Sequence, residues 1–120
     1  MKYFCDTYAL VEMTRGNKGY LAYVDEELHT SILNLYELLY NLLKQYDEHV
    51  AKKYFYEFRA LVLEDKDEYI FVAAEFKLKN TKKNISYADA LGYAIAQTEN
   101  MKFLTGDKEF QNLDNVEFVR

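Results

Sequence analysis

Four acidic residues stand where α/β proteins place their chemistry. In open α/β sheets, ligands bind outside the carboxyl ends of the strands, so a polar residue directly after a strand is well placed to act. Asp6 follows the apolar run "KYFC", and Asp107 follows "MKFLTG". Asp89 lies in the first turn of a predicted helix and Glu37 near the start of another, where the helix dipole favours a carboxylate. These four acids are therefore expected to converge at one edge of the sheet.

Each acid also has a purely structural explanation, and acids are common in this chain, with 20 among 120 residues. Asp89 completes Ser86-x-x-Asp89, which is typical of a capping box at a helix start. Asp107 could be a turn residue, and Glu37 could be a helix residue that faces solvent. Asp6 is the hardest to explain in this way, because a charge at the end of a buried strand needs a partner. Taken together, the four acids favour a site.

Convergent carboxylates indicate a particular chemistry. They repel one another, and each is pushed toward its neutral form unless a cation lies between them. Mg²⁺ and Mn²⁺ prefer oxygen ligands and leave coordination positions for water and phosphate oxygens. Such a site can hydrolyse a phosphodiester. A bound metal would also let a chain of net charge −5 accept a polyanion.

The elements that must position these acids alternate between strand and helix. Short apolar runs predict strands over residues 2–5, 101–105 and 115–119. Helical spacing of apolar residues predicts helices over 7–13, 20–28, 48–63 and 87–99, and within 30–46, a segment that begins strand-like. Residues 69–80 are ambiguous and are interpreted as a strand or turn leading into a helix. This alternation predicts an α/β fold with a largely parallel sheet, and the length suits one domain over 1–120.

Four motifs carry a resemblance to a known family. They are "FCDTYALVE", "ILNLYELL", "SYADALGYAIA" and "FLTGDKEF". Over nearly its whole length the chain resembles the PIN-domain nucleases, and among them the small toxin ribonucleases of VapBC-type toxin–antitoxin pairs. The resemblance implies a three-layer α/β/α fold with a mostly parallel central sheet. Residues 44–57 follow the family only in being helical.

The resemblance also implies roles for particular residues. It assigns four residues to an acidic quartet, which are Asp6, Glu37, Asp89 and Asp107. The quartet would bind Mg²⁺ or Mn²⁺ and catalyse the hydrolytic cleavage of RNA. The resemblance places the hydroxyls of Thr7 and Thr105 against the carboxylates or the attacking water, although Thr7 could equally be an ordinary helix cap. It further implies an antitoxin partner that covers the acidic groove, and a homodimer.

Composition bears on the cellular compartment in which the protein is expected. The longest apolar run, residues 90–96, is far shorter than the roughly 18 residues of a membrane-spanning helix. Asp6 interrupts the N-terminal apolar run before a signal-peptide core could form. The single cysteine, Cys5, excludes a disulfide within the chain and suits a reducing compartment. We therefore expect a soluble cytoplasmic protein that has no membrane partner.

Two basic clusters stand out against the acidic background. One consists of Lys77, Lys79, Lys82 and Lys83, and the other of Arg15 with Lys18. Each could be a solvated surface loop or a local patch for nucleic acid.

Other functions remain as alternatives. A haloacid-dehalogenase-like phosphatase would need a second Asp two residues after Asp6, where this chain has Tyr8. A receiver domain would need a further acid beside Asp6 and a phosphorylatable Asp after a middle strand, and neither is evident in this sequence. The main alternative is a catalytically idle PIN-like module that binds protein or RNA. Stabilisation by a divalent ion would distinguish a nuclease from such a module.

Overall fold

A four-stranded parallel sheet forms the centre of the molecule. The computed structural model describes residues 1–120. Its strands are β1 (Lys2–Cys5), β2 (Glu27–His29), β3 (Lys102–Thr105) and β4 (Val116–Phe118). They lie in the order β2-β1-β3-β4, and every neighbouring pair is parallel. The predicted α/β fold with a mostly parallel sheet is confirmed, with β4 at the predicted edge.

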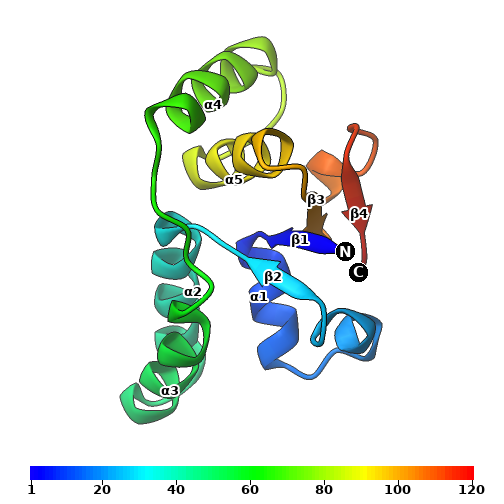
Figure 1. The fold of residues 1–120 in the computed structure, drawn as a ribbon. Coiled ribbons are helices and arrows are strands. Elements are labelled where there is room, and N and C mark those ends of the chain that lie inside the picture. The colour runs from blue at the N-terminus through cyan, green and yellow to red at the C-terminus, as the bar shows by residue number, and fades with distance from the viewer.

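Helices cover both faces of the sheet and make the predicted three layers (Figure 1). The α-helices are α1 (Thr7–Thr14), α2 (Ile32–Gln45), α3 (Glu48–Arg59), α4 (Asp67–Lys79) and α5 (Tyr87–Thr98). Two 3₁₀ helices, η1 (Lys18–Tyr23) and η2 (Lys108–Phe110), complete the set. Helix α5 packs on β1 and β3 with α4 outside it, while α1 packs on the other face and α2 with α3 lies beyond. None of these helices has both the length and the apolar character needed to cross a bilayer.

Alternation along the central strands divides the core between the two faces. Phe4 and Phe103 point toward α5, and their rings stack with centroids 5.9 Å apart. Cys5 and Leu104 point to the opposite face, toward α1 and α2. Successive strand residues face opposite sides of a sheet, so four short strands can serve two cores. Gly92 lets α5 approach closely, since a Cβ there would lie 2.4 Å from a Phe4 ring carbon.

The prediction of a helix over residues 20–28 is wrong in its second half. Only η1 is helical, and Glu27–His29 forms β2, which pairs with β1 in parallel register. This edge strand is half-buried or exposed, so it carries no apolar run. Its backbone pairing with β1 determines the conformation, and the side-chain pattern does not reveal it.

The prediction for residues 69–80 is also wrong, because no strand or turn precedes a helix there. Helix α4 runs from Asp67 to Lys79 without a break. Tyr69 and Ala73, four residues apart, are buried against α5. That packing decides the structure of an apolar run that periodicity alone cannot assign. The segment 30–46 likewise has no strand of its own beyond one isolated bridge at Thr30, and α2 begins after its cap.

Candidate active site

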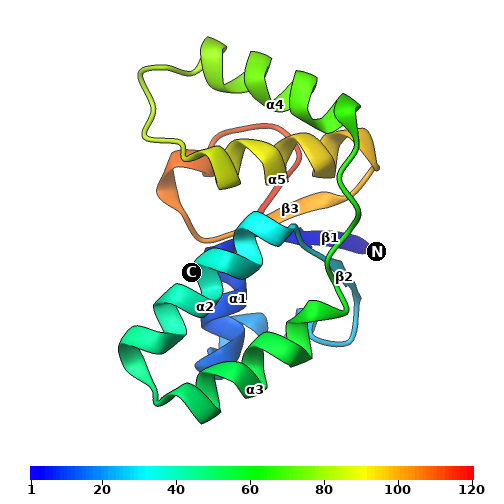
Figure 2. The ribbon, with the colours of Figure 1, turned by 90° about the vertical axis from the view of Figure 1, so that its left-hand side faces the viewer.

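Adjacent parallel strands bring two of the predicted acids side by side. β1 and β3 are neighbours, with Cys5 opposite Leu104. Asp6 follows β1 directly, and one residue, Gly106, separates Asp107 from the end of β3. Figure 2 shows the turn after β3, the start of α5 and helix α2 gathered on this side of the molecule.

A groove of about 380 Å³ at this edge is lined by three of the four acids, Asp6, Asp89 and Asp107. The rest of its wall comes from α1, which contributes Glu12, from the α1 C-cap Arg15, and from α2, which contributes Asn41. Glu37 does not line this groove. It borders a neighbouring hollow with Tyr36 and Tyr40.

Asp6 is the most deeply buried acid, with 1% of its surface exposed. It is the N-cap of α1, and the Ala9 amide donates to its Oδ1 at 2.8 Å. The Thr105 hydroxyl donates to its Oδ2 at 2.5 Å. Burial raises the pKa of Asp6 to about 8, although these hydrogen bonds lower it, and the carboxylates of Asp89 and Asp107 raise it further. The folded protein therefore disfavours a charge at Asp6 in the absence of a cation.

Asp89 forms the capping box that the sequence predicts. Its backbone amide donates to the Ser86 hydroxyl oxygen at 3.1 Å, and the Ser86 amide donates to its carboxylate at 3.3 Å. Burial raises the pKa of Asp89 to about 6, the Ser86 hydrogen bonds oppose that rise, and Asp107 and Glu37 add to it. The structural explanation for Asp89 and its place in the groove are thus both correct.

Asp107 is a turn residue and also faces the groove. It caps η2, where the Glu109 amide donates to its Oδ1 at 3.0 Å. The Asp107 amide donates to the Thr105 hydroxyl oxygen at 3.0 Å. The same hydroxyl donates to Asp6, so Thr105 links the two acids. Thr105 is fully buried and can turn no other way without losing one of these bonds.

Glu37 is tied to the site through Thr7. The Thr7 hydroxyl donates to Glu37 Oε1 at 2.6 Å, and it accepts from the Asn34 side-chain amide at 3.1 Å. Asn34 in turn accepts from Ser31, the N-cap of α2, at 2.7 Å. Thr7 is the first residue of α1 and is not its cap, which is Asp6.

Asn34 is a buried polar residue that the sequence analysis did not single out. The pattern Ser31-x-x-Asn34 was the available signal, since a Ser at that spacing before an amphipathic run is typical of a helix start. Its amide fixes the orientation of the Thr7 hydroxyl and, through it, of Glu37.

The carboxylates are not gathered into a finished metal site. As the side chains lie, no three His, Cys, Asp or Glu residues form a group that could hold a metal ion. Three acids nevertheless keep one carboxylate oxygen free of hydrogen bonds, because Asp89, Asp107 and Glu37 each accept through the other oxygen only. An oxygen-only donor set fits Mg²⁺ or Mn²⁺. Burial disfavours the ionised form of the Asp6 carboxyl, and a bound cation would stabilise that form.

Removal of the Thr7 hydroxyl should show what it contributes to the folded protein. Thr7→Val keeps the shape but leaves Glu37 without its donor and Asn34 without its acceptor. We expect a loss of about 1–2 kcal/mol in the free energy of unfolding, measured by denaturant titration. Thr7→Ser, which keeps the hydroxyl, should be nearly as stable as the wild type. Equal stabilities of the two variants would show that the hydroxyl does not matter.

Comparison with known proteins identifies the family. The PIN domain model matches residues 3–116. The chain belongs to the PIN-domain family. No curated protein matches the sequence.

Solved structures share the PIN-domain fold at low sequence identity. The toxin VapC20 of Mycobacterium tuberculosis, described as cleaving the sarcin–ricin loop, superposes with a TM-score of 0.78 and 18% identity over 98% of this chain and 99% of its own. VapBC2 from Rickettsia felis, bound to a DNA fragment from its promoter, gives 0.76 and 19% identity over the full length of both chains. VapBC-1 from nontypeable Haemophilus influenzae gives 0.74 and 19% identity, covering 98% and 96%. The PIN-like fold expected from the sequence is confirmed.

Proposed function

We propose that this PIN-domain protein is a metal-dependent ribonuclease that hydrolyses RNA phosphodiester bonds, and that it is the toxin of a toxin–antitoxin pair. One observation carries the proposal, which is that Asp6, Asp89 and Asp107 line a single groove at the carboxyl ends of β1 and β3. The similarity of the fold to VapC toxins supports the same conclusion.

The four acids, Asp6, Glu37, Asp89 and Asp107, would hold Mg²⁺ or Mn²⁺. When bound, the metal supplies positive charge that activates water and stabilises the oxygens of the phosphodiester. The chain prepares the groove for this. Thr105 ties the Asp6 carboxylate to the backbone amide of Asp107, and Thr7 holds the Glu37 carboxylate. Arg15 adds a cationic side chain to the groove wall, where a phosphate group would compete with Glu12, whose Oε2 lies 3.7 Å from its Nη1.

Partners and setting follow from the same proposal. Several similar structures are toxin–antitoxin complexes, including one from Klebsiella pneumoniae, which supports an antitoxin partner for this chain. We propose a homodimer, for which the many exposed apolar side chains on the helices give a basis. We also propose a cytoplasmic location, consistent with the free, buried thiol of Cys5.

Cleavage of a mixed single-stranded RNA by the purified protein tests the proposal. The reaction should proceed in Mn²⁺ or Mg²⁺, stop in EDTA, and be absent from Asp107→Asn under all conditions. Asp114→Asn is the matched control, because Asp114 is an exposed turn residue outside the groove. Metal-independent cleavage, or cleavage that survives Asp107→Asn, would point to a contaminating nuclease and contradict the proposal.

An idle PIN-like module is the second candidate. It is favoured by the lack of any three acidic side chains already grouped as metal ligands. The same experiment decides between the two candidates, because an idle module would not cleave RNA whichever metal ion is added.

A further inference from the structure

The loop between α4 and α5 is the strongest basic feature of an acidic molecule. Residues 76–88 contain four lysines and no acidic residue, in a chain of net charge −5. Lys79, Lys82 and Lys83 are exposed, and none of them forms an ion pair. Their charge is therefore available to a ligand. We call residues 79–86, which carry these three lysines, the lysine loop.

Hydrogen bonds fix the lysine loop beside two of the acids. At one end, Ser86 is bonded reciprocally to Asp89 in the capping box. In the middle, Lys83 Nζ donates to the Glu109 carbonyl at 3.4 Å. Glu109 in turn donates its amide to Asp107. The lysine loop thus lies against the starts of both α5 and η2, which carry acids of the groove.

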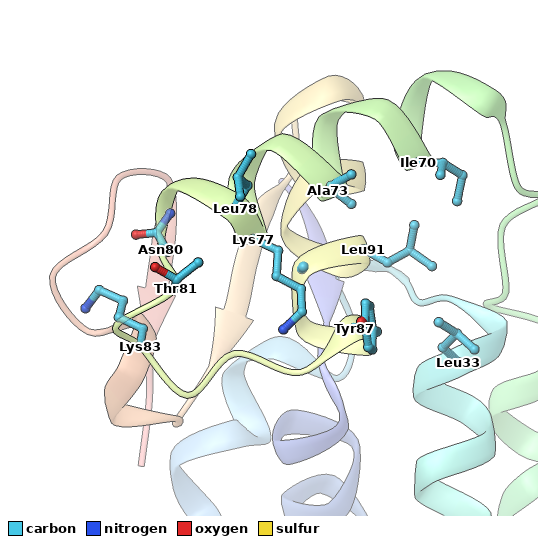
Figure 3. Close-up of a pocket in the computed structure, with 12 residues that line it drawn as sticks. Leu33, Ile70, Ala73, Lys77, Leu78, Asn80, Thr81, Lys83, Tyr87 and Leu91 are labelled. Carbon is cyan, nitrogen blue, oxygen red and sulfur yellow. The ribbon is translucent and has the colours of Figure 1, made fainter.

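An aromatic ring completes the surface. Tyr87 is 78% exposed and lies two residues before Asp89. The Lys77 ammonium lies 4.7 Å from the centroid of its ring and also donates to the Ile85 carbonyl at 2.7 Å. Figure 3 shows Lys77 reaching from α4 toward Tyr87 at the start of α5, with Lys83 on the connecting loop. The lysine–tyrosine contact holds the ring in place with most of its surface open to solvent.

These features match the chemistry of single-stranded nucleic acid. Proteins bind such strands with cationic grooves that follow the backbone and aromatic rings on which bases stack. The groove itself is lined by acids and repels phosphates, so a strand that reaches it needs neighbouring positive charge. The acid-free run with the most lysines adjoins Asp89 and Asp107.

We propose that the lysine loop and Tyr87 bind the RNA strand on its path into the acidic groove, with lysines on the phosphates and the tyrosine ring beneath a base. This inference rests on the proposed function and adds to it the surface that grips the substrate. An acidic protein is the competing occupant of the same lysines, but the exposed ring beside them favours a nucleic acid.

Salt-dependent RNA binding tests the role of the lysines. Affinity for a short single-stranded RNA is measured by fluorescence anisotropy in Ca²⁺ at several salt concentrations, with the RNA checked for intactness. Loss of two phosphate contacts in Lys82→Gln/Lys83→Gln should reduce the slope of log K against log salt by about 1.4, and weaken binding on the order of tenfold near 0.1 M salt.

A second lysine pair provides the matched control. Lys52→Gln/Lys53→Gln removes the same charge from α3, which packs chiefly on α2, and there Lys52 is already paired with Glu48 at 2.9 Å. This variant should keep the wild-type slope. Tyr87→Ala should weaken binding by about tenfold without changing the slope, and Tyr87→Phe should restore it.

The outcomes separate this inference from the proposed function. If the wild-type protein cleaves RNA with metal but the two lysine pairs change the slope equally or not at all, the lysine-loop surface is wrong and the ribonuclease stands. Retained RNA affinity with loss of an acidic partner protein would assign the lysines to that partner. If the wild-type protein neither binds nor cleaves RNA, both proposals fail.

Discussion

Asp6→Asn should abolish RNA cleavage while raising the melting temperature of the metal-free protein. The carboxylate is fully buried with no cation beside it, and burial raises its pKa to about 8. Asparagine keeps an oxygen for the Ala9 amide, gives up the acceptor of the Thr105 hydroxyl, and removes the charge. We expect a gain of about 1–3 kcal/mol in the free energy of unfolding at pH 7, measured by denaturant titration in EDTA.

The gain from Asp6→Asn should depend on pH in a defined direction. At pH 3 and below the carboxyl is largely protonated in both states, because the ordinary pKa of an aspartate is 3.8, so wild type and variant should differ little. As pH rises from about 4 toward 8, the unfolded chain ionises while the folded protein keeps the proton, and wild-type stability falls. The difference should therefore be greatest above pH 8.

Divalent metal should reverse this order of stability. Mn²⁺ at 100 times its dissociation constant would stabilise the wild type by about 2.7 kcal/mol, and Asp6→Asn should gain much less. Asp114→Asn should behave as wild type in both buffers. A variant that loses both fold and cleavage would contradict the assignment of Asp6 as a destabilising, functional acid.

Gly106→Ala is expected to be strongly destabilising. A Cβ at this position would lie 2.2 Å from a Tyr8 ring carbon and 2.4 Å from the Val119 carbonyl oxygen. The ring could move, but the backbone of the segment after β4 cannot yield in the same way. We expect a loss of about 2–4 kcal/mol, which corresponds to a fall of about 10 °C in melting temperature.

Cleavage should fall with Gly106→Ala as well, even below the new melting temperature, because the displaced turn carries Asp107. Gly16→Ala is the control. A Cβ at Gly16 meets nothing within 4 Å, and only its positive φ of 70° penalises alanine, by about 1 kcal/mol. A Gly106→Ala protein as stable as the Gly16 variant would show that the chain relaxes around the collision.

The sequence allows prediction of those parts of the fold that depend on local chemistry. The strand before Asp6 and the capping box at Asp89 are both visible as patterns, and both are confirmed. β2 and the start of α4 are not predictable in this way. The first is defined by pairing with β1, and the second by packing against α5.

In the candidate site, too, the sequence predicts the features that follow from local patterns and not those that depend on tertiary packing. The rule that ligands bind beyond strand ends predicts that Asp6 and Asp107 are neighbours. The Thr105 bridge between them, and the chain from Ser31 through Asn34 to Glu37, depend on side-chain orientations that exist only after the helices have packed. The roles of the four acids in metal binding and catalysis stay predictions.

The order in which the sheet is assembled has a consequence during synthesis of the protein. Of the four strands, β1 comes first in the sequence and is central in the sheet, and one of its two neighbours, β3, begins at Lys102. The Thr105 hydroxyl that holds Asp6 comes from a residue 99 positions later. Contacts across so long a stretch of chain form late in folding, because the intervening loop must first be closed. A growing chain therefore carries Asp6 and Glu37 long before the groove can form, because Thr105 and Asp107 must be made first.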